Sequence, residues 1–407
     1  MDLPAHGQPR SEVLSRMREM KSEDADWKGG RTWSLIYPAG EDVDEVLREA
    51  ANLYLFENAL NPFRFPSLRR METEVVEMTA GLLRAPPGFG GCMTSGGTES
   101  ILMAVKTARD RAVAERGVTV PELLAPFSAH PAFAKAAHYL GLTLKQIPLN
   151  AELTADVDAA SKMVTDQTAL IVGSAPSYPH GVIDPIEDLA RLASKHGISF
   201  HTDACVGGFL LPFMQMLGVE VTPFDFTVEG VTTMSSDVHK YGYATKGASV
   251  ILHRDGAHLQ YQTFLYSDWP GGMYGSFAMA GARPSAPIAV AWAVMNYLGI
   301  DGYKRLTYRI VETVDKLREG IQSIDGLAII GEPQASIIAF GSEQFDVMAV
   351  GDGMDRRGWH LDRQQDPSAL HMMVSPEHDR IVDEFLSDLR ESVEQRGASA
   401  GVEARYS

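Results

Sequence analysis

The residue best suited to covalent chemistry is Lys240, which lies in the run SDVHKYGY at residues 236–243, just after a strand-like stretch. A lysine forms a Schiff base only as a neutral amine, and an enclosed site favours the neutral form. The adjacent His239 suits the phosphate of a cofactor held by such a lysine. The run therefore predicts a cofactor-carrying lysine, although on its own it also describes a surface lysine beside a packed histidine.

The second candidate site residue is an acidic residue at the end of a strand. Asp203 follows the strand predicted at 198–202, and ligands of open α/β sheets gather at the carboxyl ends of the strands. A carboxylate there is able to keep the pyridine nitrogen of pyridoxal 5′-phosphate (PLP) protonated, which makes the ring an electron sink. The alternative is a helix N-cap, since residues 204–209 could begin a helix or a loop. His201 points to the same sheet face, and we expect it near the cofactor as packed core rather than as a catalyst.

A glycine-containing run before a helix is the third candidate. Residues 94–100, TSGGTES, precede an amphipathic helix, so their backbone N–H groups and the helix dipole form an anion site. A phosphate fits there. The run is also compatible with a plain turn or with a nucleotide phosphate, although it matches neither the Walker nor the dinucleotide pattern. His130, in SAHPAF at 128–133, is a candidate for stacking on a cofactor ring, whereas a lone histidine ahead of a helix is otherwise usually a cap or exposed.

Alternating strands and helices are expected to position these residues. Apolar residues recur at helical spacing between about 41 and 83, with an interruption by the prolines and asparagines of 58–66. Beyond them, a buried strand at 168–175, an amphipathic helix at 185–196 and a strand at 198–201 predict a mostly parallel sheet. Further strand candidates are 225–234, 247–253, 327–330 and 335–340. We expect an N-terminal arm and helical segment at 1–60, a large PLP-binding domain at 61–298 and a small C-terminal domain at 299–407.

The composition limits the partners and the location. Lys and Arg total 36 against 53 Asp and Glu, and the net charge of −17 argues against a general affinity for nucleic acid or anionic membranes. The cysteines, Cys92 and Cys205, are too few for a disulfide framework and lack metal-ligand spacing, so we expect no metal and a reducing compartment. The longest apolar stretch, 287–295, is far shorter than the roughly 20 residues that span a bilayer. These features predict a soluble cytoplasmic protein with a small-molecule substrate.

With the glycine run, His130, Asp203 and Lys240 in this order, the sequence resembles the group II PLP-dependent decarboxylase superfamily, and within it the sphingosine-1-phosphate lyase family. The resemblance runs from about residue 37 to 393. It is carried by the segments 65–67, 93–103, 179–185, 201–209, 239–247, 268–269, 271–272, 280–281, 283–284 and 358–359. Lys246, six residues after Lys240, separates the lyases from the plain amino-acid decarboxylases.

This resemblance implies a fold and a set of roles. The fold is α/β, PLP-dependent transferase fold type I, with a large domain around a mostly parallel seven-stranded sheet and a smaller C-terminal α+β domain. The protein would be a homodimer with active sites at the subunit interface. The implied assignments are Gly97, Thr98 and His239 to the cofactor phosphate, His130 to ring stacking, Asp203 to the pyridine nitrogen with His201 nearby, Ser174 to the phenolic oxygen, and Lys240 to the Schiff base.

Two features depart from the family pattern. Eukaryotic members begin with a membrane helix, which is absent here, so the resemblance implies a soluble bacterial-type form. In the segment 58–65, a histidine that faces the substrate phosphate usually stands at the position of Asn61. Asn61 can donate a hydrogen bond but carries no charge, and the nearby Arg64 is a cation that would compensate. We therefore predict substrate contacts for Asn61, Arg64 and Tyr37, reaching in from the neighbouring subunit.

The implied reaction is cleavage of the C2–C3 bond of a phosphorylated long-chain amino alcohol to a fatty aldehyde and phosphoethanolamine. Lys246 and Tyr178 are predicted to carry the proton transfers, with His130, His201 or the cofactor phosphate next in line. Since two lysines hardly both stay charged in one enclosed pocket, one of them is expected to be a neutral base. Alternatively, Lys246 pairs with a carboxylate such as Asp237 and only shapes the loop.

Two other functions remain open. One is an α-decarboxylase of amino acids, in which Arg64 or Arg283 would hold the substrate carboxylate. The other is a PLP-binding regulator without turnover, against which the intact set of Lys240, Asp203 and the glycine run argues. Release of carbon dioxide separates the decarboxylase from the lyase, and absence of turnover across amine substrates would favour the regulator.

Overall fold

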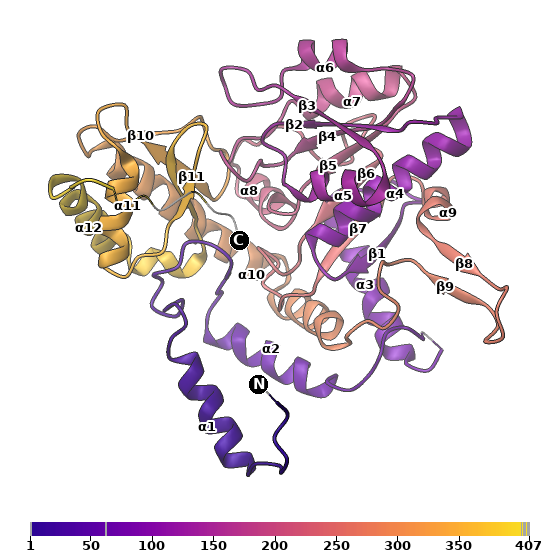
Figure 1. Ribbon diagram of the computed structural model, residues 1–407, viewed down its shortest axis with the longest axis horizontal. Helices are drawn as coiled ribbons and strands as arrows, with labels where there is room; N and C mark the ends of the chain where they lie inside the picture. The colour runs from indigo at the N-terminus through magenta and orange to yellow at the C-terminus, as the bar shows by residue number, and fades with distance from the viewer. Residues whose placement is uncertain (1, 62, 400, 402–403, 405–407) are drawn as a thin grey trace.

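A seven-stranded sheet forms the centre of the larger part of the computed structural model, which describes residues 2–61, 63–399, 401 and 404 (Figure 1). In spatial order the strands are β1 (Gly90–Thr94), β7 (Ser249–His253), β6 (Thr233–Ser236), β5 (Ser199–Asp203), β4 (Thr168–Ser174), β2 (Glu122–Pro126) and β3 (Thr143–Ile147). Strand β7 runs antiparallel to both of its neighbours, and the pairs from β6 to β3 are parallel. The mostly parallel sheet that we predicted is therefore confirmed.

Helices cover both faces of this sheet, because its central strands are apolar on both sides. All seven residues of β4 are buried. Leu170 and Val172 pack in a cluster with α4 (Gly97–Arg116) and α5 (Ala132–Leu140), whereas Ile171, which points the other way, packs in the cluster that contains α7 (Ile186–Lys195). Successive side chains of the strand point to opposite faces of the sheet, and this alternation decides which group of helices each side chain packs against.

Further helices belong to the large part. They are α2 (Glu41–Leu53), α3 (Pro66–Leu82), α6 (Val157–Met163), α8 (Leu211–Met216) and α9 (Leu259–Gln262), with short 3-10 turns at Gly207–Phe209 and Gly256–His258. The proline-rich interruption at 58–66 is the loop between α2 and α3, as expected. The predicted strand at 225–234 is wrong in its first part, because Asp225 accepts hydrogen bonds from Thr227 and Gly230 has a positive φ of 93°. Because of this local turn, strand β6 begins only at Thr233.

A smaller part lies beside the first and contains a four-stranded antiparallel sheet. Its strands, in spatial order, are β10 (Ala328–Ile329), β11 (Ile337–Gly341), β13 (Ala369–Met373) and β12 (Asp362–Gln364), with helices α11 (Val347–Arg356) and α12 (Val382–Glu394) and a 3-10 turn at Pro376–Arg380. The long helix α10 (Ala286–Gln322) connects the two parts and is kinked at Gly299, where φ is 53°. The division into residues 1–60, 61–298 and 299–407 remains our proposal.

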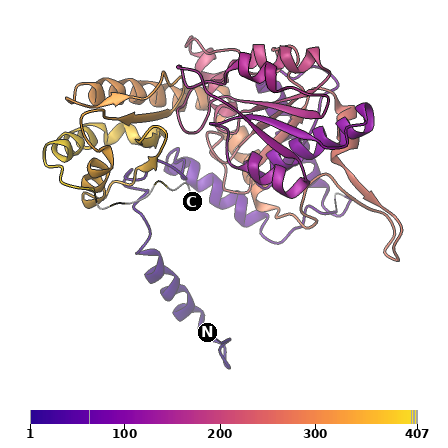
Figure 2. The same cartoon turned by 45° about the horizontal axis from the view of Figure 1, so that its top comes forward.

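Two segments extend away from the rest of the chain. Helix α1 (Arg10–Lys21) has no buried residue and stands clear of the other elements (Figure 2). The hairpin of β8 (Phe264–Tyr266) and β9 (Tyr274–Ser276) projects from the opposite end of the molecule. Within the described ranges, no helix has both the length and the apolar character that crossing a membrane requires.

Candidate active site

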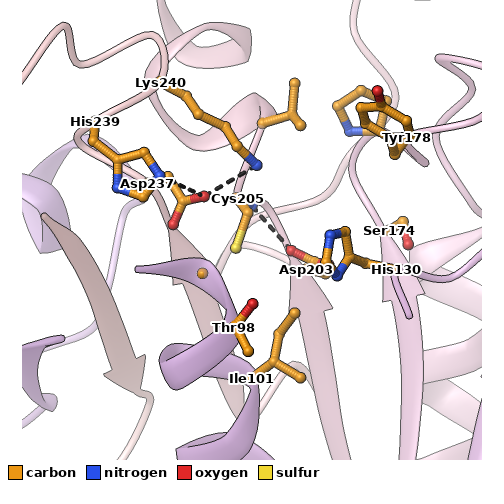
Figure 3. Close-up of a pocket in the computed structure, with 13 residues that line it drawn as sticks. Thr98, Ile101, His130, Ser174, Tyr178, Asp203, Cys205, Asp237, His239 and Lys240 are labelled. Atoms are coloured by element: carbon orange, nitrogen blue, oxygen red, sulfur yellow. Dashed lines mark hydrogen bonds and ion pairs between the residues drawn. The ribbon is translucent and has the colours of Figure 1, made fainter. Parts of the chain in front are cut away.

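The predicted chemistry converges on a pocket of about 180 Å³ at the carboxyl ends of β4 and β5 and the start of α4 (Figure 3). This is the edge of an open α/β sheet at which ligands bind. The residues that line it are Gly97, Thr98, Ile101, His130, Ser174, Pro176, Tyr178, Asp203, Cys205, Val206, Asp237, His239 and Lys240. Of the thirteen residues proposed as sites from the sequence, eight stand in this lining.

Lys240 reaches the pocket from the loop after β6 and is held by a buried carboxylate. Its Nζ lies 3.0 Å from Oδ2 of Asp237, whose side chain is 1% exposed. Burial opposes the charge of Asp237, but the positive charges of Lys240 and His239 outweigh it and hold the pKa of Asp237 below its usual value. Asp237 is therefore an anion that anchors the amine in the pocket.

His239 faces the same carboxylate from the other side. Its Nδ1 donates a hydrogen bond to the carbonyl of Ala248 at 2.8 Å, which directs Nε2 toward the pocket, 3.6 Å from Oδ2 of Asp237. Burial lowers the pKa of His239 despite the nearby carboxylate. Because Nδ1 is bonded to the backbone, Nε2 is the ring nitrogen that faces the pocket.

Asp203 and His130 lie together on the opposite wall of the pocket, as Figure 3 shows. Oδ1 of Asp203 accepts hydrogen bonds from the backbone N–H of Cys205 at 3.1 Å and from Oγ of Ser235 at 3.2 Å. Nδ1 of His130 accepts from the N–H of Ala132 at the start of α5, and burial lowers the pKa of its ring. Both residues thus make the local turn contacts that we considered as alternatives, and both also line the pocket.

The glycine run begins α4, as the sequence suggested. Gly96 has a positive φ of 153°, and a Cβ atom on Gly97 would lie 2.8 Å from Oδ2 of Asp237 and 2.9 Å from Sγ of Cys205. Only glycine therefore allows the backbone to approach the pocket this closely. The first backbone N–H groups of a 20-residue helix, including those of Gly97 and Thr98, lack partners within the helix and favour an anion.

Ser174 ends β4 and is fixed by an acidic residue outside the pocket lining. Its N–H donates to Oδ2 of Asp184 at 2.8 Å, and its carbonyl accepts from the N–H of Asp184 at 3.0 Å. Asp184 is fully buried and also accepts from the N–H of Ala155. Burial raises the pKa of Asp184 to about 6.

Five of the proposed residues lie outside the pocket lining. His201 is buried beneath it, with its ring nitrogens bonded to the hydroxyls of Thr233 and Ser235. Lys246 donates to the carbonyl of His239 at 3.1 Å, and its Nζ lies 4.6 Å from the centre of the Tyr37 ring. Lys246, on the same loop as Lys240, thus lies beside Tyr37.

Asn61 and Arg64 belong to the loop before α3. Oδ1 of Asn61 accepts from the N–H groups of Phe63 and Arg64, so it caps its own turn. Asn61 also lines a separate cavity of about 630 Å³ between α3, β1 and the residues around β9. Within one described chain these two residues do not line the Lys240 pocket, and contact with the pocket of a neighbouring subunit remains a prediction.

Five lining residues were not proposed as sites: Ile101, Pro176, Cys205, Val206 and Asp237. Asp237 carried a usable signal, because it stands three residues before Lys240 in a strand-to-loop run. Cys205 follows Asp203 by two residues and could have been placed with it. Ile101 and Val206 gave no signal beyond apolar character, which is also typical of core residues.

The donor set of the pocket fits PLP. An amine, a carboxylate beside an imidazole and the start of a helix stand on three sides of one cavity. These groups match an aldehyde, a pyridine ring and a phosphate, in that order. Among the described residues, no group of three or more His, Cys, Asp or Glu side chains is arranged to hold a metal ion.

Comparison with known proteins agrees with this chemistry. Residues 28–343 match the model of the pyridoxal-dependent decarboxylase conserved domain. The chain is 43% identical to sphingosine-1-phosphate lyase 1 of Rattus norvegicus over 396 residues, which are 97% of this chain and 70% of that protein. It is also 34% identical to L-aspartate decarboxylase of Thermococcus kodakarensis, covering 95% of this chain and 98% of that protein.

A solved structure shows the same relationship in three dimensions. The sphingosine-1-phosphate lyase of Burkholderia pseudomallei superposes with a TM-score of 0.94 at 38% identity, covering 97% of this chain and 93% of that one. The fold type I architecture that we predicted is confirmed, and so is PLP as the cofactor. With the lysine, the aspartate and the glycine run in one pocket, the chain belongs to the sphingosine-1-phosphate lyase family of pyridoxal-dependent enzymes.

Proposed function

We propose that the protein cleaves the C2–C3 bond of a phosphorylated long-chain amino alcohol, such as sphingosine 1-phosphate, into a fatty aldehyde and phosphoethanolamine. The observation that carries the proposal is the 43% identity to a sphingosine-1-phosphate lyase over 97% of the chain. The loop after β6 supports it, because this loop carries a second lysine, Lys246, in addition to Lys240.

Seven residues of the pocket have a proposed part in binding the cofactor. Lys240 holds the cofactor covalently through Nζ, and Asp203 keeps a proton at the pyridine nitrogen. His130 stacks on the ring, Ser174 faces its phenolic oxygen, and the start of α4 with His239 holds the phosphate. PLP, when bound, supplies an aldehyde for the substrate amine and a ring that accepts the electron pair of the broken bond.

Proton transfers are assigned to Tyr178, which lines the pocket, and to Lys246, which lies outside the lining on the loop of Lys240. Tyr178 or Lys246 takes the proton of the C3 hydroxyl, and a proton is returned to C2 before the product leaves. Burial, followed by the charge of Lys240, lowers the pKa of Lys246 to about 8, so a sizeable fraction is neutral near physiological pH. The ammonium therefore loses its proton more readily than an ordinary lysine does.

We further propose a homodimer with active sites at the subunit interface. Two features support it: α1 has no buried residue, and the β8–β9 hairpin exposes Phe264, Leu265 and Trp269. Tyr37, Asn61 and Arg64 would then contact substrate across the interface. A cytoplasmic location is part of the same proposal and is supported by the two unpaired cysteines, Cys92 and Cys205.

Product analysis tests the reaction. The PLP-loaded protein is incubated with sphingosine 1-phosphate, and the long-chain aldehyde and phosphoethanolamine are quantified. We expect equal amounts of both products, and none with Lys240→Ala. A wild-type protein that carries PLP yet forms no aldehyde would contradict the proposal.

The second candidate is decarboxylation of an acidic amino acid, favoured by the similarity to L-aspartate decarboxylase. One of its two proposed carboxylate holders, Arg283, already forms a two-pronged ion pair with Glu72 at 2.6 and 2.9 Å. Carbon dioxide release from L-aspartate without aldehyde formation would favour this candidate. Absence of both products across amine substrates would favour a PLP-binding regulator.

A further inference from the structure

Tyr178 stands between the Lys240 pocket and a second cavity of about 310 Å³. The second cavity is lined by Phe127, Gln364 and Asp362, among others, and it shares Tyr178 and His130 with the first. Tyr178 belongs to the large part of the chain, in the loop after β4, whereas Asp362 belongs to β12 of the small part. A contact between them therefore joins the two parts at the edge of the active site.

The pairing of β12 with β13 presents two polar side chains to Tyr178. Asp362 and His371 are direct partners across these antiparallel strands, so their side chains lie on one face of the sheet. The hydroxyl of Tyr178 donates to Oδ2 of Asp362 at 2.7 Å. Nε2 of His371 donates to the Tyr178 carbonyl at 2.9 Å, and the two rings lie 4.5 Å apart at 37°. The small sheet thus contacts the hydroxyl, the ring and the backbone of one residue.

The direction of the hydroxyl bond has a chemical consequence. A phenol has one proton to donate, and an ionised carboxylate only accepts. Burial opposes the charge of Asp362, but the hydrogen bond and charge of His371 and the hydrogen bond of Tyr178 outweigh it and lower the pKa of Asp362. Because the proton of Tyr178 is directed to Asp362, the lone pairs of the Tyr178 oxygen are left to accept a hydrogen bond from a substrate hydroxyl.

We propose that Asp362, aided by His371, is a positioning residue that makes Tyr178 a hydrogen-bond acceptor for the hydroxyl of the substrate. This inference rests on the proposed lyase function, because that reaction requires removal of the C3 hydroxyl proton. Asp362 acts through Tyr178 and does not touch the substrate itself. The small sheet thereby contributes to the chemistry of a pocket built mainly by the large one.

The chain offers a matched control. Asp388 also lies in the small part and accepts a hydrogen bond at 2.7 Å from an aromatic side chain, the indole N–H of Trp359. The side chains of Asp362 and Asp388 are 26% and 24% exposed. Neutralising Asp388 therefore removes a similar charge and a similar bond without reaching Tyr178.

The first test needs no turnover. The PLP-loaded protein is labelled with 3-fluorotyrosine, and the ¹⁹F signal that disappears in Tyr178→Phe is assigned to Tyr178. Asp362→Asn should shift this signal, because the phenol loses an anionic acceptor, and Asp388→Asn should leave it in place. An unchanged Tyr178 signal in Asp362→Asn overturns the inference.

The second test is a double-mutant cycle on the cleavage rate. Asp362→Asn should lower kcat by at least about tenfold with KM nearly unchanged, because positioning is part of the 10²–10⁴-fold contribution of acid–base catalysis. In the Tyr178→Phe background the same change should cost less than about twofold. Equal losses in both backgrounds would show that Asp362 acts independently of Tyr178. If the ¹⁹F signal shifts but the wild type forms no aldehyde, the lyase proposal fails while the Tyr178–Asp362 link stands.

Discussion

Nζ of Lys240 lies 3.0 Å from Oδ2 of Asp237, and this buried ion pair settles which of the two nearby lysines the carboxylate holds. Lys246, for which Asp237 was an alternative partner, instead donates to the carbonyl of His239. The two lysines therefore have different surroundings: one is fixed in the pocket, and the other lies beside Tyr37 on the loop. Different surroundings allow different roles.

The first prediction concerns covalent attachment. The purified protein should be yellow, with an absorption band of lysine-bound PLP, and Lys240→Ala should lose this band after dialysis because Nζ is the attachment point. Lys246→Ala is the matched control and should keep it. Borohydride reduction followed by peptide mapping should place the label on Lys240, and a label on Lys246 would refute the assignment.

The second prediction concerns the pH dependence of cleavage. Since the pKa of Lys246 is lowered to about 8, the neutral fraction and hence kcat should rise as pH increases through about 8. Lys246→Ala should keep the cofactor band, lose about 10²–10⁴-fold in kcat and lose this rising limb. A near-normal kcat in the variant would instead assign Lys246 to shaping the loop through its bond to His239.

The third prediction concerns Asp184 and stability. Its folded pKa of about 6 lies above the unfolded value of about 3.9, so the folded state binds the extra proton between these values. The contribution of Asp184 to the free energy of unfolding is therefore highest below about pH 4. It falls by about 3 kcal/mol as the pH rises to about 6.

Asp184→Asn stays neutral over this range and should lack that loss, although its single amide oxygen leaves one of the two N–H donors, on Ser174 or Ala155, without an acceptor. Urea unfolding of both proteins at pH 4.5 and pH 7 measures the difference, and other carboxylates cancel in the comparison. Equal pH dependence in the two proteins would show that Asp184 does not titrate in this window.

The fourth prediction concerns Asn61. If it replaces a histidine that faces the substrate phosphate, Asn61→His should lower KM for sphingosine 1-phosphate, mainly below the ordinary imidazole pKa of about 6.5. The turn capped by Asn61 is exposed, so the fold should tolerate the change. KM measured at pH 6 and pH 8 checks this, and a KM difference that does not vary with pH removes Asn61 from the phosphate site.

The sequence alone determined the features that depend on neighbours along the chain. The apolar run of β4, the period of α7 and the glycines before α4 are local patterns, and the backbone follows them because hydrogen bonding and burial act on adjacent residues. The position of Asp203 at a strand end and of Lys240 after the next parallel strand placed both at one sheet edge. The strand expected at 225–234 was wrong in its first part for the same local reason, because the side chain of Asp225 forms a turn.

Contacts between distant segments were decided only by the tertiary structure. No periodicity relates Tyr178 to Asp362, 184 residues later, or pairs Asp362 with His371 so that both face one tyrosine. Asp237 pairs with Lys240 and not with Lys246 because of the way the loop after β6 turns. The hydrogen bond from Ser174 to Asp184 likewise depends on the loop after β4 folding back onto the end of that strand. The position of the small sheet beside the loop after β4 sets the first of these contacts, because a hydrogen bond needs atoms within about 3 Å, whatever their separation along the chain.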